Sequence, residues 1–177
     1  MRKMRLCGKG YMTENSHPVT HGKPLKILSY VILCALGLVA DQLTKFWAYT
    51  KLRPLGQIRL WDGVFHLTYR ENTGAAFSIL EGKIWFFSVV TGIIIVLICI
   101  VLGKGMLKNT VAEYSLLFVG IGGLGNLIDR IMRGFVVDMF DFTLINFAVF
   151  NVADIFITCG CALFICVFLF KKGDIFK

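Results

Sequence analysis

Long apolar runs alternate with short polar segments along this chain. Four runs contain no charged residue, at 27–40, 85–102, 114–128 and 155–170. With their flanking residues, each approaches the ~20 residues that a helix needs to cross a bilayer. Buried helices of a soluble protein would keep a polar face, which these runs lack. The pattern therefore predicts four transmembrane helices, at about 25–49, 84–103, 111–132 and 152–170.

The period of the pattern changes between the first two predicted helices. Apolar and polar positions alternate on both sides of a turn signal, Asp62-Gly63, with apolar residues at Ile58, Leu60, Phe65, Leu67 and Tyr69. This alternation predicts a β-hairpin or ribbon within about 52–80 that has one apolar face. That face is expected to rest on the bilayer or to cover the helix ends.

The expected fold class is an all-α membrane protein of four transmembrane helices with a small extracytoplasmic β-hairpin. Residues 25–172 form its single domain, between a basic cytoplasmic tail at 1–24 and a short cytoplasmic tail at 173–177. Hydrophobic residues make up 56% of the chain and charged residues only 17%, which excludes an ordinary soluble globule. Four glycines, Gly120, Gly122, Gly123 and Gly125, predict close helix packing in lipid.

The remaining composition excludes several classes of function. The net charge of +8 does not indicate nucleic-acid binding, because no basic run is interleaved with aromatics. Five of the six cysteines lie in apolar runs and Cys7 lies in the basic tail, so buried thiols are expected rather than disulfides. The three histidines, His17, His21 and His66, are too few for a zinc site or a histidine triad, and no metal is expected.

Orientation follows from charge and from convergence of polar residues. With both termini inside, the inner segments carry eleven Lys and Arg residues and the outer segments eight. This is a weak bias toward cytoplasmic termini. The stronger argument is that this orientation places Asp41, the hairpin, Asp138 and Asp154 at one extracytoplasmic face.

Asp138 and Asp154 are the candidates for chemistry. Asp138 follows the outer end of the third helix in a connecting loop, and Asp154 begins the fourth, so a short connection can bring them together. Two carboxylates in a partly desolvated site share one proton. The ionised one can activate water while the protonated one polarises a carbonyl, as in aspartic proteases. Which aspartate carries the proton is left open.

The neighbouring polar residues have structural interpretations. Asp129 beside Arg130 is expected to neutralise buried charge, and Asp41 is expected to pair with Lys45 or Arg130. Asn151 lies one helical turn before Asp154, so it either caps the helix or orients the acid. Asp141 is expected to be solvated in the connecting loop.

Two other classes of function compete with hydrolysis. A small transporter would use the same acids as a proton relay, but it predicts acids spread through the membrane depth. An assembly or anchoring subunit gives no reason for two converging carboxylates.

Five blocks of sequence, in order along about 25–170, resemble the lipoprotein signal peptidases of bacteria (type II signal peptidases). The blocks are Asp41-Gln-Leu-Thr-Lys45, Asn72-Thr-Gly-Ala-Ala-Phe-Ser78, Gly122-Gly-Leu-Gly-Asn-Leu-Ile-Asp-Arg130, Val136-Val-Asp138 and Phe150-Asn-Val-Ala-Asp154.

The resemblance implies an aspartic endopeptidase of the bacterial inner (cytoplasmic) membrane. Such an enzyme removes the signal peptide from a diacylglyceryl-modified prolipoprotein, cleaving before the lipidated cysteine. By motif position, the catalytic pair falls on Asp138 and Asp154. The substrate-binding or supporting residues fall on Asp41, Asn72, Asn126, Asp129, Arg130 and Asn151. The expected partners are the prolipoprotein and membrane lipids, without nucleic acid, metal or organic cofactor, and the enzyme is expected to be a monomer.

Overall fold

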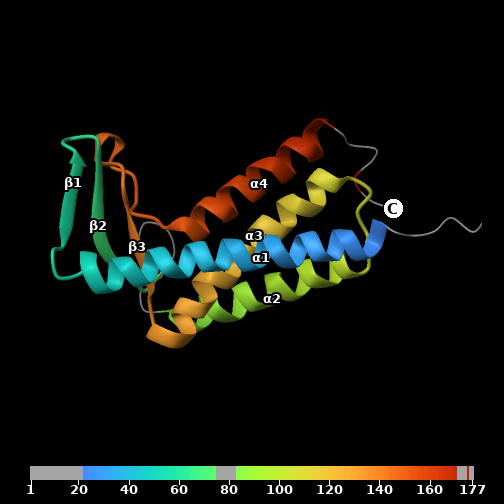
Figure 1. The fold of residues 1–177 in the computed structure, drawn as a ribbon, viewed down its shortest axis with the longest axis horizontal. Helices are drawn as coiled ribbons and strands as arrows, with labels where there is room; N and C mark the ends of the chain where they lie inside the picture. The colour runs from blue at the N-terminus through green and yellow to red at the C-terminus, as the bar shows by residue number, and fades with distance from the viewer. Residues whose placement is uncertain (1–21, 75–82, 171–174, 176–177) are drawn as a thin grey trace, which may run out of the picture.

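Four long helices run side by side, and a small sheet closes one end of the bundle (Figure 1). The computed structural model describes residues 22–74, 83–170 and 175. The helices are α1 (Gly22–Trp47), α2 (Ile84–Gly103), α3 (Thr110–Arg133) and α4 (Val152–Phe170). Each is long and apolar enough to cross a membrane. These features confirm the predicted fold class.

The helix α3 is the central helix of the bundle. It packs against α1, α2 and α4 and buries ten of its residues, whereas α2 buries Ile98 alone. The outer surfaces of α1, α2 and α4 are covered with exposed large apolar side chains. Apolar faces of this extent are rare on soluble proteins, and they match a surface solvated by lipid.

Glycines allow α3 to approach its neighbours closely. A Cβ atom at Gly122 would lie 2.2 Å from the carbonyl oxygen of Ala153 in α4, and one at Gly125 would lie 2.5 Å from Oδ2 of Asp41. At Gly123 the nearest atom, Cγ2 of Thr91, would be at an ordinary 3.5 Å. Close helix packing therefore explains Gly122 and Gly125, as predicted from the sequence.

The sheet contains three antiparallel strands in the order β1-β2-β3. The strands are β1 (Gln57–Trp61), β2 (Phe65–Asn72) and β3 (Val136–Asp141). The first two form the predicted hairpin, whose turn contains Gly63 at a φ of 72°. The third strand was expected to be a loop. Its four consecutive buried residues hide the alternation that marks a half-exposed strand, and its partner β2 is distant in sequence.

The apolar face of the hairpin covers the end of α1. This helix continues into a π-helical turn, Ala48–Leu52, which packs against β3 and the hairpin. The shared core contains Ala48, Leu52, Val137 and Met139, with Ile58, Leu67 and Tyr69 packed against it. Of the two expectations for this face, covering the helix ends is the one that the structure supports.

The described ends of the chain lie at the opposite end of the bundle from the sheet (Figure 1). There the buried Ile175 accepts a hydrogen bond from the backbone N–H of Lys108 at 2.8 Å. The buried Glu113 of α3 pairs with Lys26 of α1 at this same end. One buried acid thus lies far from the predicted site, as the sequence interpretation did not foresee.

Candidate active site

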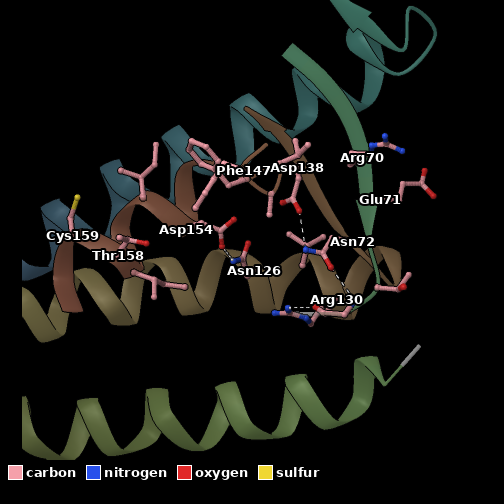
Figure 2. A pocket seen from close by; sticks show the side chains of 18 of the residues that line it. Arg70, Glu71, Asn72, Asn126, Arg130, Asp138, Phe147, Asp154, Thr158 and Cys159 are labelled. Carbon is pink, nitrogen blue, oxygen red and sulfur yellow. Dashed lines mark hydrogen bonds between the residues drawn. The ribbon is translucent and has the colours of Figure 1, made fainter. Parts of the chain in front are cut away.

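A cavity of about 880 Å³ lies beside the sheet, bordered by the ends of β2 and α3, by β3, and by the start of α4. Both candidate carboxylates line it, one from a strand and one from a helix (Figure 2). Five of the eight predicted site residues line this cavity, namely Asn72, Asn126, Arg130, Asp138 and Asp154. The other three lie in hydrogen-bond contact with them or with their neighbours.

Asp138 is held by the backbone ladder of the sheet. The helix α3 ends at Gly134, whose left-handed backbone (φ 76°) turns the chain into β3. In β3, Asp138 pairs with Arg70 of β2, and it is 2% exposed. Its carboxylate accepts hydrogen bonds from Nδ2 of Asn72 at 2.9 Å and from Nδ2 of Asn151 at 2.6 Å. The predicted loop position is therefore wrong, and Asp138 sits on a fixed strand.

Asp154 is held by the first turn of α4. Asn151 and Asp154 form a reciprocal cap, because Oδ1 of Asn151 accepts the N–H of Asp154 at 3.0 Å. In return, Oδ2 of Asp154 accepts the N–H of Asn151 at 3.1 Å. Asn151 thus both caps the helix and orients the acid. The positive end of the helix dipole therefore lies beside this carboxyl group.

Two asparagine side chains connect the carboxylates. Nδ2 of Asn151 donates to Asp138 and also to Oδ1 of Asn126, at 3.2 Å. Nδ2 of Asn126 in turn donates to Oδ1 of Asp154 at 2.8 Å (Figure 2). Because these donors are amides, they orient both carboxylates without adding charge to the site.

Burial changes the protonation of Asp138. Desolvation first, and then the negative charge of Asp154, raises the pKa of Asp138 from 3.8 to about 7. Asp138 therefore retains a proton at pH values where an exposed aspartate has lost it. Two carboxyl groups in opposite protonation states can take a proton from water and give one to a leaving group.

A fully buried lysine, Lys45, lies at the base of this network. Its Nζ is 2.9 Å from Oδ2 of Asp41, 3.4 Å from Oδ2 of Asp129 and 2.8 Å from Oδ1 of Asn126. The pairing of Asp41 with Lys45 confirms one of the two alternatives for that acid. Lys45 itself was missed as a site residue, although an acid and a lysine four residues apart at the end of an apolar run were a usable signal.

Asp129 also neutralises a different partner from the predicted one. It is fully buried, pairs with Arg133 and Lys45, and accepts the backbone N–H of Val137 at 3.1 Å. The expected pairing with Arg130 is wrong. Adjacent residues on a helix do not face each other, whereas a residue four positions later does.

Arg130 faces the cavity instead. Its guanidinium donates to the carbonyl oxygen of Gly74 at 3.3 Å and lies 5.6 Å from the ring centre of Phe87 (Figure 2). Asn72 is oriented from the same loop, because its Oδ1 accepts the N–H of Gly74 at 3.0 Å. The rest of the predicted 72–78 block, from 75 onward, lies outside the described residues.

Asp141 is half-buried and lies on a strand, not in the connecting loop where it was expected. It ends β3, and its Oδ2 accepts a hydrogen bond from the hydroxyl of Thr68 in β2 at 2.7 Å. Its side chain is not among the residues that line the cavity. Asp141 is therefore a residue of the sheet rather than of the site.

Comparisons with known proteins agree on one family. A family model described as Signal peptidase (SPase) II matches residues 33–170. The lipoprotein signal peptidase of Lactococcus lactis subsp. lactis (strain IL1403) is 42% identical over 147 residues, which cover 83% of this chain and 97% of that protein. The lipoprotein signal peptidase of Streptococcus pyogenes serotype M5 (strain Manfredo) is 39% identical over 153 residues, covering 86% and 97%. A solved structure described as a bacterial membrane enzyme is 30% identical, with a TM-score of 0.77 over 83% of this chain and 91% of the other.

We expect Asp129→Asn to destabilise the protein, because Arg133 and Lys45 would lose a buried anionic partner. Breaking a buried ion pair from one side costs about 3 kcal/mol of unfolding free energy. Unfolding of the purified protein in detergent micelles measures the change. The control is Asp62→Asn, because the Asp62–Arg59 pair is exposed and worth little. Equal unfolding curves for both variants would contradict the structural role of Asp129.

Proposed function

This chain belongs to the signal peptidase II family, and on that premise we propose that Asp138 and Asp154 are its catalytic pair. The protein is an aspartic endopeptidase of a bacterial membrane. It removes the signal peptide from diacylglyceryl-modified prolipoproteins and cleaves before the lipidated cysteine. The observation that carries the residue assignment is that both carboxylates line one cavity and are linked through Asn126 and Asn151.

In the proposed mechanism the two acids have different roles. Asp154, at the N-terminus of α4 with two hydrogen-bond donors, is the ionised base that takes a proton from the attacking water. Asp138 retains its proton and donates a hydrogen bond to the scissile carbonyl oxygen. The hydroxide adds to the carbonyl carbon to form a tetrahedral intermediate. Collapse of this intermediate breaks the C–N bond, and the proton on Asp154 passes to the leaving amine.

The supporting residues act by position. Asn72 and Asn151 both donate to Asp138, so they hold its carboxyl group toward the cavity. Arg130 lines the same cavity and supplies a cation beside a bound peptide. These groups are in place before substrate arrives, which avoids reorganisation during the reaction.

The cavity also suits a substrate that is part peptide and part lipid. It extends from Asp154 along α4 past Ile157 to Cys159, so its lining changes from acidic to mostly apolar within two helical turns. We place the scissile peptide at the acidic end and the acyl chains of the modified cysteine toward the apolar end. The network of hydrogen bonds is complete within one chain, which supports our proposal that the enzyme acts as a monomer.

We also propose that both termini are cytoplasmic and that the cavity opens at the extracytoplasmic face. The charge bias of the loops supports this orientation, as does the position of the start of α1 and the end of α4 opposite the sheet (Figure 1). An exported precursor presents its cleavage site on that outer face. The acidic pair therefore meets the substrate where translocation leaves it.

We expect Asp138→Asn and Asp154→Asn each to reduce cleavage by on the order of 10⁴-fold, because each removes a carboxyl group that exchanges a proton during the reaction. Purified protein in lipid is incubated with a diacylglyceryl-modified prolipoprotein, and the product masses are measured over time. Asp141→Asn is the matched control, because Asp141 lies on the same strand and does not line the cavity. Near-normal turnover by Asp138→Asn or by Asp154→Asn would refute the assignment of the catalytic pair.

The pH dependence of kcat/KM should show an alkaline limb near pH 7, because deprotonation of Asp138, with its pKa raised to about 7, removes the acid. Asn72 donates to this carboxylate and so lowers that pKa. In Asn72→Ala the pKa of Asp138 rises, and the midpoint of the limb moves to higher pH. The pH midpoint of the alkaline limb is compared between the wild type and Asn72→Ala, and this comparison does not depend on their maximal rates. A limb that moves to lower pH would contradict the proton assignment.

Topology is tested with single cysteines in a background without the six native ones. Asp62 lies in the hairpin turn, with a side chain 81% exposed, and Met106 lies between α2 and α3, 45% exposed. We expect Asp62→Cys to react with a membrane-impermeant thiol reagent in intact cells, and Met106→Cys only after the inner membrane is broken. In a host with an outer membrane, that membrane is first made permeable. The reverse labelling pattern would place the catalytic pair on the cytoplasmic side and would contradict the proposed orientation.

A further inference from the structure

The ammonium group of Lys45 is surrounded by oxygen atoms of the protein. An ammonium group has three donors and no acceptor. The three atoms around its Nζ are all oxygens, from Asp41, Asp129 and Asn126. Two of these belong to carboxylates that neutralise the charge, and the third belongs to a neutral amide. The contact with Asn126, at 2.8 Å, is a hydrogen bond to a neutral group, so it does not serve to neutralise the charge of the lysine.

This contact decides which way the amide of Asn126 faces. With Oδ1 toward the ammonium, Nδ2 lies 2.8 Å from Oδ1 of Asp154 and donates to it. The opposite orientation would place an NH2 group against the NH3⁺ of Lys45 and an oxygen against the carboxylate of Asp154. Both contacts would then be repulsive. A second donor, Nδ2 of Asn151, also points at Oδ1 of Asn126 and favours the observed orientation.

We propose that Lys45 is a positioning residue, which holds the Asn126 amide so that Asp154 always receives a hydrogen-bond donor. This inference rests on the proposed catalytic pair. Lys45 does not line the cavity, so it acts on the reaction through Asn126 and not by touching substrate. Through Asn126, Lys45 keeps the carboxylate of Asp154 oriented to accept the proton of water. Asp154 lies at the N-terminus of α4, where the helix dipole is positive.

A purely structural role for Lys45 makes a different prediction. If the lysine only neutralised Asp41 and Asp129, its loss would lower the yield of folded protein but leave the turnover of the folded fraction intact. If it acts through Asn126, its loss lowers kcat and leaves KM nearly unchanged. The loss of kcat on removing Lys45 must also disappear in a protein whose residue 126 has no amide to orient.

The test is a double-mutant cycle on the full-length protein in lipid, with cleavage of a diacylglyceryl-modified prolipoprotein as the assay. We expect Lys45→Met to lower kcat on the order of 100-fold, as small misplacements of catalytic groups do, with KM changed by less than about twofold. In an Asn126→Ala background, Lys45→Met should cause no further loss beyond about twofold. Losses that multiply would overturn the proposal.

Two further variants make the outcome decisive. Lys26→Met is the matched control, because Lys26 is also a lysine of α1 that pairs with a buried acid, Glu113 of α3, but at the end away from the cavity. The kcat of this variant should be normal. Asn126→Asp keeps an oxygen for Lys45 but faces Asp154 with an acceptor. If Lys45→Met yields no folded protein, Asn126→Asp decides: a normal kcat overturns the proposal, and a loss as large as that of Asn126→Ala supports it.

The same assay separates this inference from the proposed function. No cleavage by the wild-type protein would overturn the function of the site and the inference with it. Cleavage by the wild type, together with losses that multiply in the cycle, would overturn only the role of Lys45.

Discussion

The site depends on one constraint: polar groups buried in apolar surroundings must find partners within the protein. Lys45 is fully buried, forms ion pairs with Asp41 and Asp129, and donates a hydrogen bond to Asn126. From there the pattern of donors and acceptors continues through Asn126 and Asn151 to both carboxylates. Each amide has its orientation set by its neighbour, because a donor that faced another donor would remain unsatisfied. The orientation of the side chains in this network is therefore set by the need to pair donors with acceptors as well as by packing.

The backbone supports this network with rigid elements. Asp138 is carried by a strand that is paired on β2, and Asp154 by a capped first helical turn, so neither acid lies on a free loop. Close packing at Gly122 and Gly125 brings α3 against α4 and α1, which allows Asn126 to reach both of its partners. A paired strand and a capped helix therefore hold the two carboxyl groups in fixed positions.

The membrane and the chemistry impose related demands. Burial inside the protein removes water from Asp138, and this desolvation together with the charge of Asp154 raises the pKa of Asp138. The surrounding lipid is where the acyl chains of a lipoprotein precursor lie. The cavity lies at the end of the bundle beside the sheet, and its apolar end extends along α4.

The sequence by itself determined the four helices and the hairpin, because uncharged runs of this length and alternating apolar positions are local signals. It also singled out Asp138 and Asp154, which the structure places at one cavity. It did not reveal β3, whose pairing with β2 joins distant segments, nor the partner of Asp129, which is Arg133 rather than Arg130. The contact between Lys45 and Asn126 likewise forms only because α1 and α3 pack together. Contacts between distant segments depend on how the helices are arranged in space, and a linear pattern of apolar and polar residues does not contain that arrangement. The tertiary structure alone decided which polar groups share the interior of the bundle, and with them the orientation of each donor around the two carboxylates.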